Sequence, residues 1–145
     1  MVPPGHPPPI PPAEFIGCPP RSAAVLIDLA EHVDGELPTW VRQARSQGSL
    51  LFADVGWDAT QRWDPGVLDR LDSVHAFFPN AAEAMAYTRT ATAQDALYAI
   101  ADRVPLAVVT RGSEGALAID ATSAEEAAVP ALRVHALDPT GAGAA

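Results

Sequence analysis

Five short apolar runs mark candidate strands along the chain, and segments with helical spacing separate most of them. The apolar residues of each run are consecutive rather than alternating with polar ones, which is typical of strands covered on both faces in a parallel sheet. Strands and helices that alternate at this spacing form βαβ units. The pattern predicts an α/β fold with strands at 23–28, 50–55, 74–78, 106–110 and 116–119.

Helices are predicted between these runs. One begins at Pro38 and ends at Gly48, and a shorter one begins at Pro65. Proline suits the first turn of a helix, and glycine suits the position after its end. The clearest helix runs from Thr92 to Arg103, where apolar residues recur with the three- and four-residue spacing of one helix face.

The last part of the predicted sheet changes direction. Residues 112–115 include two glycines and form a tight turn between the runs at 106–110 and 116–119. This turn predicts one antiparallel hairpin after the parallel strands. Residues 129–135 are a candidate for a further strand, and Pro130 restricts that strand to an edge, or itself to the start of the strand.

The first 20 residues differ in composition from the rest, since they hold nine of the fifteen prolines and the single cysteine, Cys18. Proline lacks a backbone donor and favours extended polyproline II, so residues 1–20 are predicted to be a disordered lead and residues 21–145 the folded part. The lead is either an inert tail or a ligand for an aromatic groove in a partner. A single cysteine cannot form an internal disulfide, which indicates a reducing compartment, the cytoplasm.

The charges exclude several functions. The formal net charge is −9, and all nine cations are arginines. Without lysine the chain can form neither a P-loop phosphate clamp, nor the active-site lysine of protein kinases, nor a Schiff base. An acidic chain with no basic run repels a nucleic-acid backbone, so no nucleic-acid partner is expected. No apolar run approaches the ~18 residues of a membrane span, so no membrane partner is expected either.

Polar residues end several of the apolar segments. Ligands of open parallel sheets bind beyond the carboxyl ends of the strands, so side chains at these positions are candidates for a common site. The candidates are Asp28, Asp54, Asn80, Thr110 and Asp138.

Asn80 and Glu83 permit two readings. In the structural one, Asn80 caps a helix and Glu83 sits three residues later, which is the spacing of a capping box. In the functional one, Glu83 at the positive helix end orders a hydrated magnesium ion beside nucleotide phosphates.

Two glycine-containing segments are also open to two readings. In the segment Thr110–Gly115, Gly112 and Gly115 either give the positive φ of a hairpin or let a ligand approach the backbone. In the segment 138–145, the glycines either serve an ordinary turn or leave backbone N–H groups free to cradle an anion.

Together these motifs resemble those of the ribokinase-like, or pfkB, carbohydrate kinases. Asn80–Glu83 is similar to the family's N-x-x-E motif, Thr110–Gly115 to its T-x-G-x-x-G turn, and Asp138–Gly143 to its D-T-x-G-A-G-D signature. Asp54–Trp57 resembles a D-x-N-x-R segment more loosely. The resemblance covers about residues 23–143, and it implies a three-layer α/β/α ribokinase-like sheet with an antiparallel hairpin, incomplete at both ends.

The resemblance implies transfer of the γ-phosphoryl group of ATP to a hydroxyl of a sugar or nucleoside. By that resemblance Asn80 and Glu83 would organise Mg²⁺ and its waters. Thr110, Gly112 and Gly115 would face the nucleotide.

The glycine-rich segment would supply the phosphoryl site by the same resemblance. The backbone N–H groups of Gly141, Ala142 and Gly143 would form an anion hole, and Asp138 would lie where some members hold a monovalent cation. The next position holds the family's catalytic Asp, but here it is Ala144, which cannot accept a proton.

Two further departures concern the loose match, because Gly56 and Asp58 replace the family's Asn and Arg. The family's chains are also about twice as long as this one. We therefore expect an inactive or impaired fragment of a kinase, with a non-catalytic nucleotide-binding or interaction module as the alternative.

Overall fold

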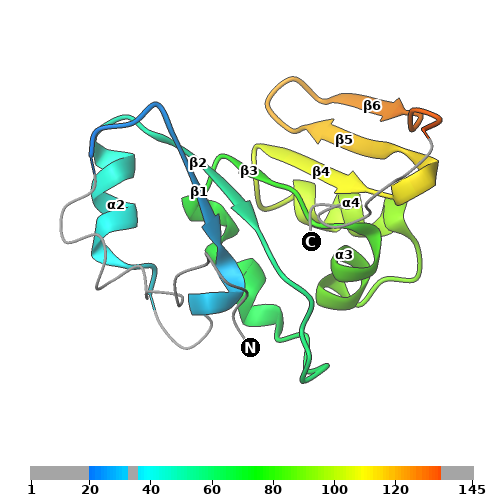
Figure 1. Ribbon diagram of the computed structural model, residues 1–145, viewed down its shortest axis with the longest axis horizontal. Helices are drawn as coiled ribbons and strands as arrows, with labels where there is room; N and C mark the ends of the chain where they lie inside the picture. The colour runs from blue at the N-terminus through cyan, green and yellow to red at the C-terminus, as the bar shows by residue number, and fades with distance from the viewer. Residues whose placement is uncertain (1–19, 33–35, 135–145) are drawn as a thin grey trace, which may run out of the picture.

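The structure is a computed structural model that describes residues 20–32 and 36–134. Its centre is a single mixed sheet whose strands lie side by side in the order in which they follow along the chain (Figure 1). The first four strands are parallel, and the last two are antiparallel additions. The strands are β1 (Ala24–Asp28), β2 (Leu50–Asp54), β3 (Ala76–Phe77), β4 (Leu106–Thr110), β5 (Ala116–Asp120) and β6 (Glu125–Val129).

The helices form between the parallel strands, as the sequence predicts. Three of them carry labels in Figure 1, namely α2 (Thr39–Ser46), α3 (Ala81–Thr88) and α4 (Ala93–Ala101). Three short 3₁₀ segments complete the order: η1 (Leu29–His32), η2 (Pro65–Ser73) and η3 (Gly112–Glu114). The helix predicted from Pro65 is therefore confirmed in position, but it is 3₁₀ rather than α.

Side chains at the helix starts explain these boundaries. The Thr92 hydroxyl accepts a hydrogen bond from the backbone N–H of Asp95 at 3.0 Å, and the carboxylate of Asp64 accepts one from Gly66 at 2.8 Å. Each cap satisfies one of the backbone donors that a helix start leaves unpaired. No described helix is long and apolar enough to cross a membrane.

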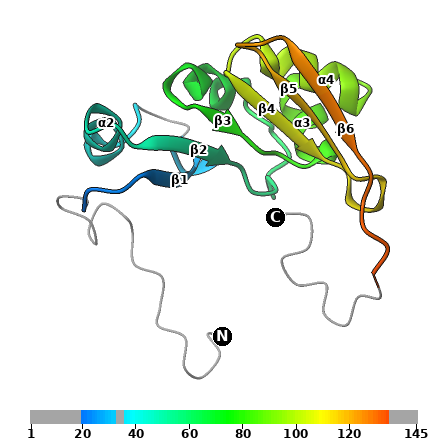
Figure 2. The ribbon, with the colours of Figure 1, turned by 90° about the horizontal axis from the view of Figure 1, so that it is seen from above.

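The main hydrophobic core lies on one face of the sheet. One row of side chains runs in register across five strands, and all its members are buried: Ile27, Ala53, Phe77, Ala107 and Ile119. The described helices pack against this face, and Figure 2 shows α3 and α4 on the same side of the sheet.

The opposite face corrects one expectation. Continuous apolar runs predicted cover on both faces, yet Leu26 is 71% exposed, and its neighbours Phe52 and Phe78 stack on each other with ring centroids 5.8 Å apart. The sheet order explains the difference, because each parallel strand is added on the same side of the previous one. Right-handed crossovers then carry every connecting helix to one face. The described residues thus supply the sheet and one helical layer of the expected three.

The strand predicted at 129–135 is wrong in position. The sixth strand is β6, Glu125–Val129, and the described residues 130–134 form no strand. All five β6 residues are exposed and two are glutamates, so the strand has no apolar pattern to detect. It is held by backbone pairing with β5, and its charges suit an edge strand because they discourage further pairing.

Candidate active site

Four of the five polar strand-end residues lie at the carboxyl edge of the parallel strands. Asp28 and Asp54 are directly paired across β1 and β2. Asn80 forms a parallel bridge with Thr110, which ends β4. Because the strands are parallel, residues at equivalent ends meet at one edge. Asp138 lies outside the described residues.

Asn80 and Glu83 form the predicted capping box at the start of α3. The backbone N–H of Glu83 donates to Asn80 Oδ1 at 2.8 Å, and the backbone N–H of Asn80 donates to Glu83 Oε2 at 3.0 Å. The structural reading of this motif is therefore confirmed. It leaves one carboxylate oxygen of Glu83 unused.

That remaining oxygen makes Glu83 unusual. The side chain is 1% exposed, and its Oε1 has no hydrogen-bond partner among the described residues. Burial raises the pKa of Glu83, and the charges of Asp54 and Asp28 raise it further. A buried carboxylate oxygen without a donor costs free energy unless a ligand or water satisfies it. Glu83 therefore combines a helix cap with an unsatisfied negative group at the sheet edge.

The surroundings of Glu83 fit a hydrated magnesium ion better than a directly coordinated metal. Within the described ranges no group of three or more His, Cys, Asp or Glu side chains is arranged to hold a metal ion. Mg²⁺ retains several of its waters in proteins and often binds through only one or two carboxylates. Glu83 Oε1 could accept a hydrogen bond from such a water.

The turn after β4 is built differently at its two glycines. Gly112 has φ +56° with nothing near the place of a β-carbon, whereas a β-carbon on Gly115 would overlap the carbonyl oxygen of Val129 and lie 2.8 Å from Cα of Pro130. Gly115 thus makes room for the chain's own backbone, and Gly112 faces open space. At the start of the turn, the hydroxyl of Thr110 is buried and has no hydrogen-bond partner within the described part of the chain.

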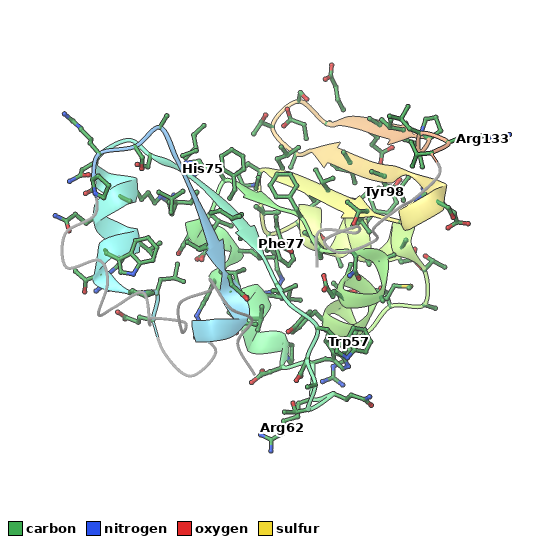
Figure 3. The ribbon with its side chains drawn as sticks, viewed as in Figure 1. Trp57, Arg62, His75, Phe77, Tyr98 and Arg133 are labelled. Atoms are coloured by element: carbon green, nitrogen blue, oxygen red, sulfur yellow. The ribbon has the colours of Figure 1, made fainter. Side chains whose placement is uncertain are left out.

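Sequence reasoning missed a cavity of about 410 Å³ beyond the ends of β1 and β2. The segment 56–64 and Tyr87 of α3 line much of it. Trp57 and Trp63 meet edge to face at 4.6 Å between ring centroids, and Trp63 meets Tyr87 in the same way at 5.2 Å. In Figure 3, Trp57 lies beside α3 and Arg62 extends from the tip of the loop. The signal that could have indicated this site is the pair Trp57 and Trp63, six residues apart in a chain with few aromatic residues.

Asp58 holds the cavity loop in shape. Its Oδ1 accepts from the N–H and the hydroxyl of Thr60, and its Oδ2 accepts from the N–H of Trp63 at 2.8 Å. These bonds lower the pKa of Asp58. They also offset the backbone strain of Trp63, whose φ is +46°. Asp58 is the residue that stands where the D-x-N-x-R segment has an arginine.

Burial raises the pKa of Tyr87 to about 12, with smaller contributions from Asp58, Asp28, Glu83 and Asp64. The phenol therefore stays protonated at neutral pH, and the cavity wall at Tyr87 is an uncharged hydroxyl within a negative field. The same field reaches Asp54, whose pKa is raised by burial and by Asp28.

The predicted phosphoryl site cannot be placed in this way. Gly141, Ala142 and Gly143, together with Ala144, lie outside the described residues. Their roles stay predictions.

Solved structures of sugar and nucleoside kinases are similar to this chain. Aminoimidazole riboside kinase from Salmonella enterica, complexed with aminoimidazole riboside and an ATP analog, matches with 26% identity and a TM-score of 0.58, over 70% of this chain and 35% of that one. A fructokinase double mutant from Vibrio cholerae O395, with fructose, ADP and potassium bound, matches with 25% identity and a TM-score of 0.57, over 70% and 34%.

Adenosine kinase from Sinorhizobium meliloti shares the fold at 21% identity, with a TM-score of 0.64 over 80% of this chain and 37% of that one. The chain therefore spans little more than a third of the length of these kinases. No curated protein matches it in sequence.

A family model described as pfkB family carbohydrate kinase matches residues 29–144. The match begins at the end of β1 and includes the capping box, the turn after β4 and the glycine-rich segment. The predicted resemblance is thereby confirmed, and the chain belongs to the pfkB family of carbohydrate kinases.

Proposed function

We propose that this chain is the nucleotide-binding portion of an ATP-dependent kinase that phosphorylates a hydroxyl of a sugar or nucleoside. The observation that carries the proposal is the buried Oε1 of Glu83, which has no hydrogen-bond partner among the described residues and lies close to the bridge between Asn80 and Thr110 at the sheet edge. Family membership gives the reaction class, and the similar kinases were solved with an ATP analog, ADP or their acceptors.

Glu83 and Asn80 would hold Mg²⁺ through its waters. When bound there, the ion would neutralise charge on the nucleotide phosphates. The chain's own part is to keep Glu83 ionised and oriented, and the capping box does this by fixing its other oxygen on the N–H of Asn80. The raised pKa of Glu83 means that burial makes its ionised form less favourable. A bound cation would reduce this penalty.

The turn after β4 would receive the nucleotide. Thr110 contributes a buried hydroxyl, and Gly112 presents open backbone. Among residues 20–32 and 36–134, the hydroxyl has no hydrogen-bond partner and nothing lies within 4 Å of the place of a β-carbon on Gly112. We assign Gly115 to the same turn. Its lack of a side chain lets the backbone of Val129 and Pro130 pack against it, so it fixes the shape of the turn. The turn carries one cation and one anion, Arg111 and Glu114, so it has no net charge and can lie against phosphate or ribose without net repulsion.

The transfer step would depend on the segment 138–144. Gly141, Ala142 and Gly143 would stabilise the moving phosphoryl group through backbone N–H groups. Asp138 would help to bind a monovalent cation. Ala144 cannot remove the proton of the acceptor hydroxyl, and general-base catalysis contributes about 10²–10⁴-fold in rate. We therefore propose that the chain transfers phosphoryl groups slowly or not at all.

Nucleotide binding is tested by calorimetric titration of the 145-residue chain with a non-hydrolysable ATP analog, with and without Mg²⁺. We expect weak binding that Mg²⁺ strengthens, and we expect Glu83→Gln to remove the Mg²⁺ effect. Glu126→Gln, a change at an exposed carboxylate of β6, is the control and should behave as the unmodified chain. Equal Mg²⁺ dependence in the Glu83→Gln variant would contradict the metal assignment.

Catalysis is tested separately by sugar-dependent ADP release. The unmodified chain should release none above background, and rapid release from it would contradict the role given to Ala144. A second candidate function, nucleotide binding without transfer, is favoured by the same alanine. It predicts that Ala144→Asp leaves the release at background, whereas a fragment with an otherwise intact site predicts that this change increases it.

A further inference from the structure

The cavity beyond β1 and β2 is not used by the proposed phosphoryl transfer. It has a size suited to a small molecule, about 410 Å³, and lies outside the carboxyl ends of parallel strands. Among its lining residues, the exposed large hydrophobic side chain is Trp57, which is 58% exposed. An exposed indole beside a cavity offers a large, mostly apolar ring face to a ligand.

Trp57, Trp63 and Tyr87 form an aromatic wall that is rigid enough to act as a binding surface. Trp57 rests on Trp63, and Trp63 rests on the buried Tyr87, with the two edge-to-face contacts described above. Trp63 is packed against the core. The hydrogen bond from the backbone N–H of Trp63 to Asp58 Oδ2 fixes the loop that carries Trp63. These contacts hold the indole of Trp57 in position before any ligand binds.

The charge around this wall is negative. Asp28, Asp58 and Asp64 line the cavity, and Arg62 is the only cation among its lining residues. Asp28 and Asp64 each use Oδ1 to accept one backbone N–H, from Ala30 and Gly66. Their Oδ2 atoms accept no hydrogen bond from the described residues.

Behind the cavity wall a fourth carboxylate adds to the field. Glu83 lies one helical turn before Tyr87 on α3, is buried, and has an oxygen without a partner among the described residues. An indole face combined with carboxylate oxygens that no described residue occupies suits an organic cation, because the ring attracts positive charge and the carboxylates neutralise it. A phosphate or carboxylate ligand would be repelled.

We propose that the cavity lined by Trp57, Tyr87 and Asp28 binds a small organic cation, an ammonium group on a carbon skeleton, through the face of Trp57. This site is separate from the phosphoryl-transfer chemistry, and it is a property of this chain's own loop. The arginine of the D-x-N-x-R segment is here Asp58, which changes the local charge by two units toward the negative.

The proposal is tested by ligand-observed NMR on the whole chain with matched pairs of probes. Choline is compared with dimethylbutanol, its uncharged isostere, and glucosamine with glucose. We expect at least one cationic probe to bind at least 10-fold more tightly than its neutral partner, and raised salt to weaken it. The two pairs distinguish a quaternary amine from an aminated sugar, and either result supports the proposal. Equal signals from charged and neutral probes in both pairs would overturn it.

Variants locate the binding. Trp57→Ala should weaken the cationic probe at least 10-fold, whereas Tyr98→Ala, which removes an exposed aromatic residue of α4, should leave it unchanged. Asp28→Asn keeps an oxygen for the N–H of Ala30 and should weaken the cation about 3-fold or more without changing the neutral partner. Unchanged binding in Trp57→Ala would overturn the proposal. ATP-analog binding, measured in Trp57→Ala, should not change, which separates this inference from the proposed function.

Discussion

Two halves of the carboxyl edge of the sheet differ sharply in charge and shape. Over β1 and β2, Asp28 and Asp54 end adjacent strands, and the following loop adds a cavity with further carboxylates and an exposed indole. Over β3 and β4, Asn80 and Thr110 are uncharged, Arg111 and Glu114 of the following turn carry opposite charges, and Gly112 leaves the backbone open. This half therefore has no net charge and is called the uncharged half. The two halves are suited to ligands of opposite charge, since carboxylates repel phosphates and attract cations.

Glu83 stands at the boundary between the halves. It belongs to the uncharged half through its hydrogen bonds with Asn80, and to the acidic half through the effect of Asp54 and Asp28 on its pKa. A cation placed at this boundary would lower the repulsion between phosphates on one side and carboxylates on the other. The comparison thus explains why a single buried glutamate is the best candidate for the metal.

The largest effect is expected at the turn of the uncharged half. Gly115→Ala should destabilise the fold by about 3–5 kcal/mol, because the methyl group meets the Val129 backbone and the conformation at φ +88° is unfavourable for alanine. Gly112→Ala, at φ +56° with free space, should cost only about 1–2 kcal/mol. Urea unfolding measures both. Equal losses would mean that the two glycines do not differ as described.

The next effect tests the aromatic wall of the acidic half. Trp63→Ala should lower the free energy of unfolding by about 2–3 kcal/mol, since its ring packs against the core and Tyr87. Trp57→Ala should cost about 0.5 kcal/mol, because this ring is largely exposed. Thermal or urea unfolding gives the comparison. A large loss at Trp57 would make it a structural residue and weaken its role as a binding surface.

A smaller effect separates capping from binding at Asn80. Asn80→Ala and Thr92→Ala each remove a helix cap and should each cost about 1 kcal/mol in urea unfolding. Only Asn80→Ala is expected to weaken binding of the ATP analog, because Asn80 also holds Glu83, the proposed Mg²⁺ residue, through the capping box. If both variants bind the analog equally well, Asn80 acts as a cap alone.

The smallest effect concerns pH. The pKa of Glu83 is raised in the folded state, so the folded protein binds a proton more readily than the unfolded one. Ionised Glu83 therefore lowers stability, and the loss grows as pH rises from the ordinary value of 4.5 through the folded pKa. Glu83→Gln should be more stable than the unmodified chain at pH 7 and should differ little from it below that window. Urea midpoints at several pH values check this, with Glu126→Gln as the control.

The sequence predicted the parallel half of the fold well and the antiparallel end less well. Apolar runs and helix caps leave local signals, so Thr92 and Pro65 marked helix starts correctly. Strand β6 left none, because all its side chains are exposed and its place depends on hydrogen bonds to β5. Local patterns report burial, and this strand has almost none.

The site shows the same division. The spacing of Asn80 and Glu83 was enough to predict the capping box, which is a local motif within one turn of helix. The cavity at Trp57 could not be predicted, since it brings together residues from β1, the loop after β2 and α3. Contacts between residues so far apart in the sequence exist only once the sheet has formed.

By itself the sequence determined the family, the order of strands and helices, and the residue types available for chemistry, because these depend on composition and on spacing along the chain. Tertiary structure alone decided that the described helices cover one face of the sheet and that Gly115 accommodates the backbone of Val129. It also decided that one oxygen of Glu83 finds no hydrogen-bond partner among the described residues. Each of these depends on which distant segments come into contact, and burial, charge and free space at a site are properties of those contacts.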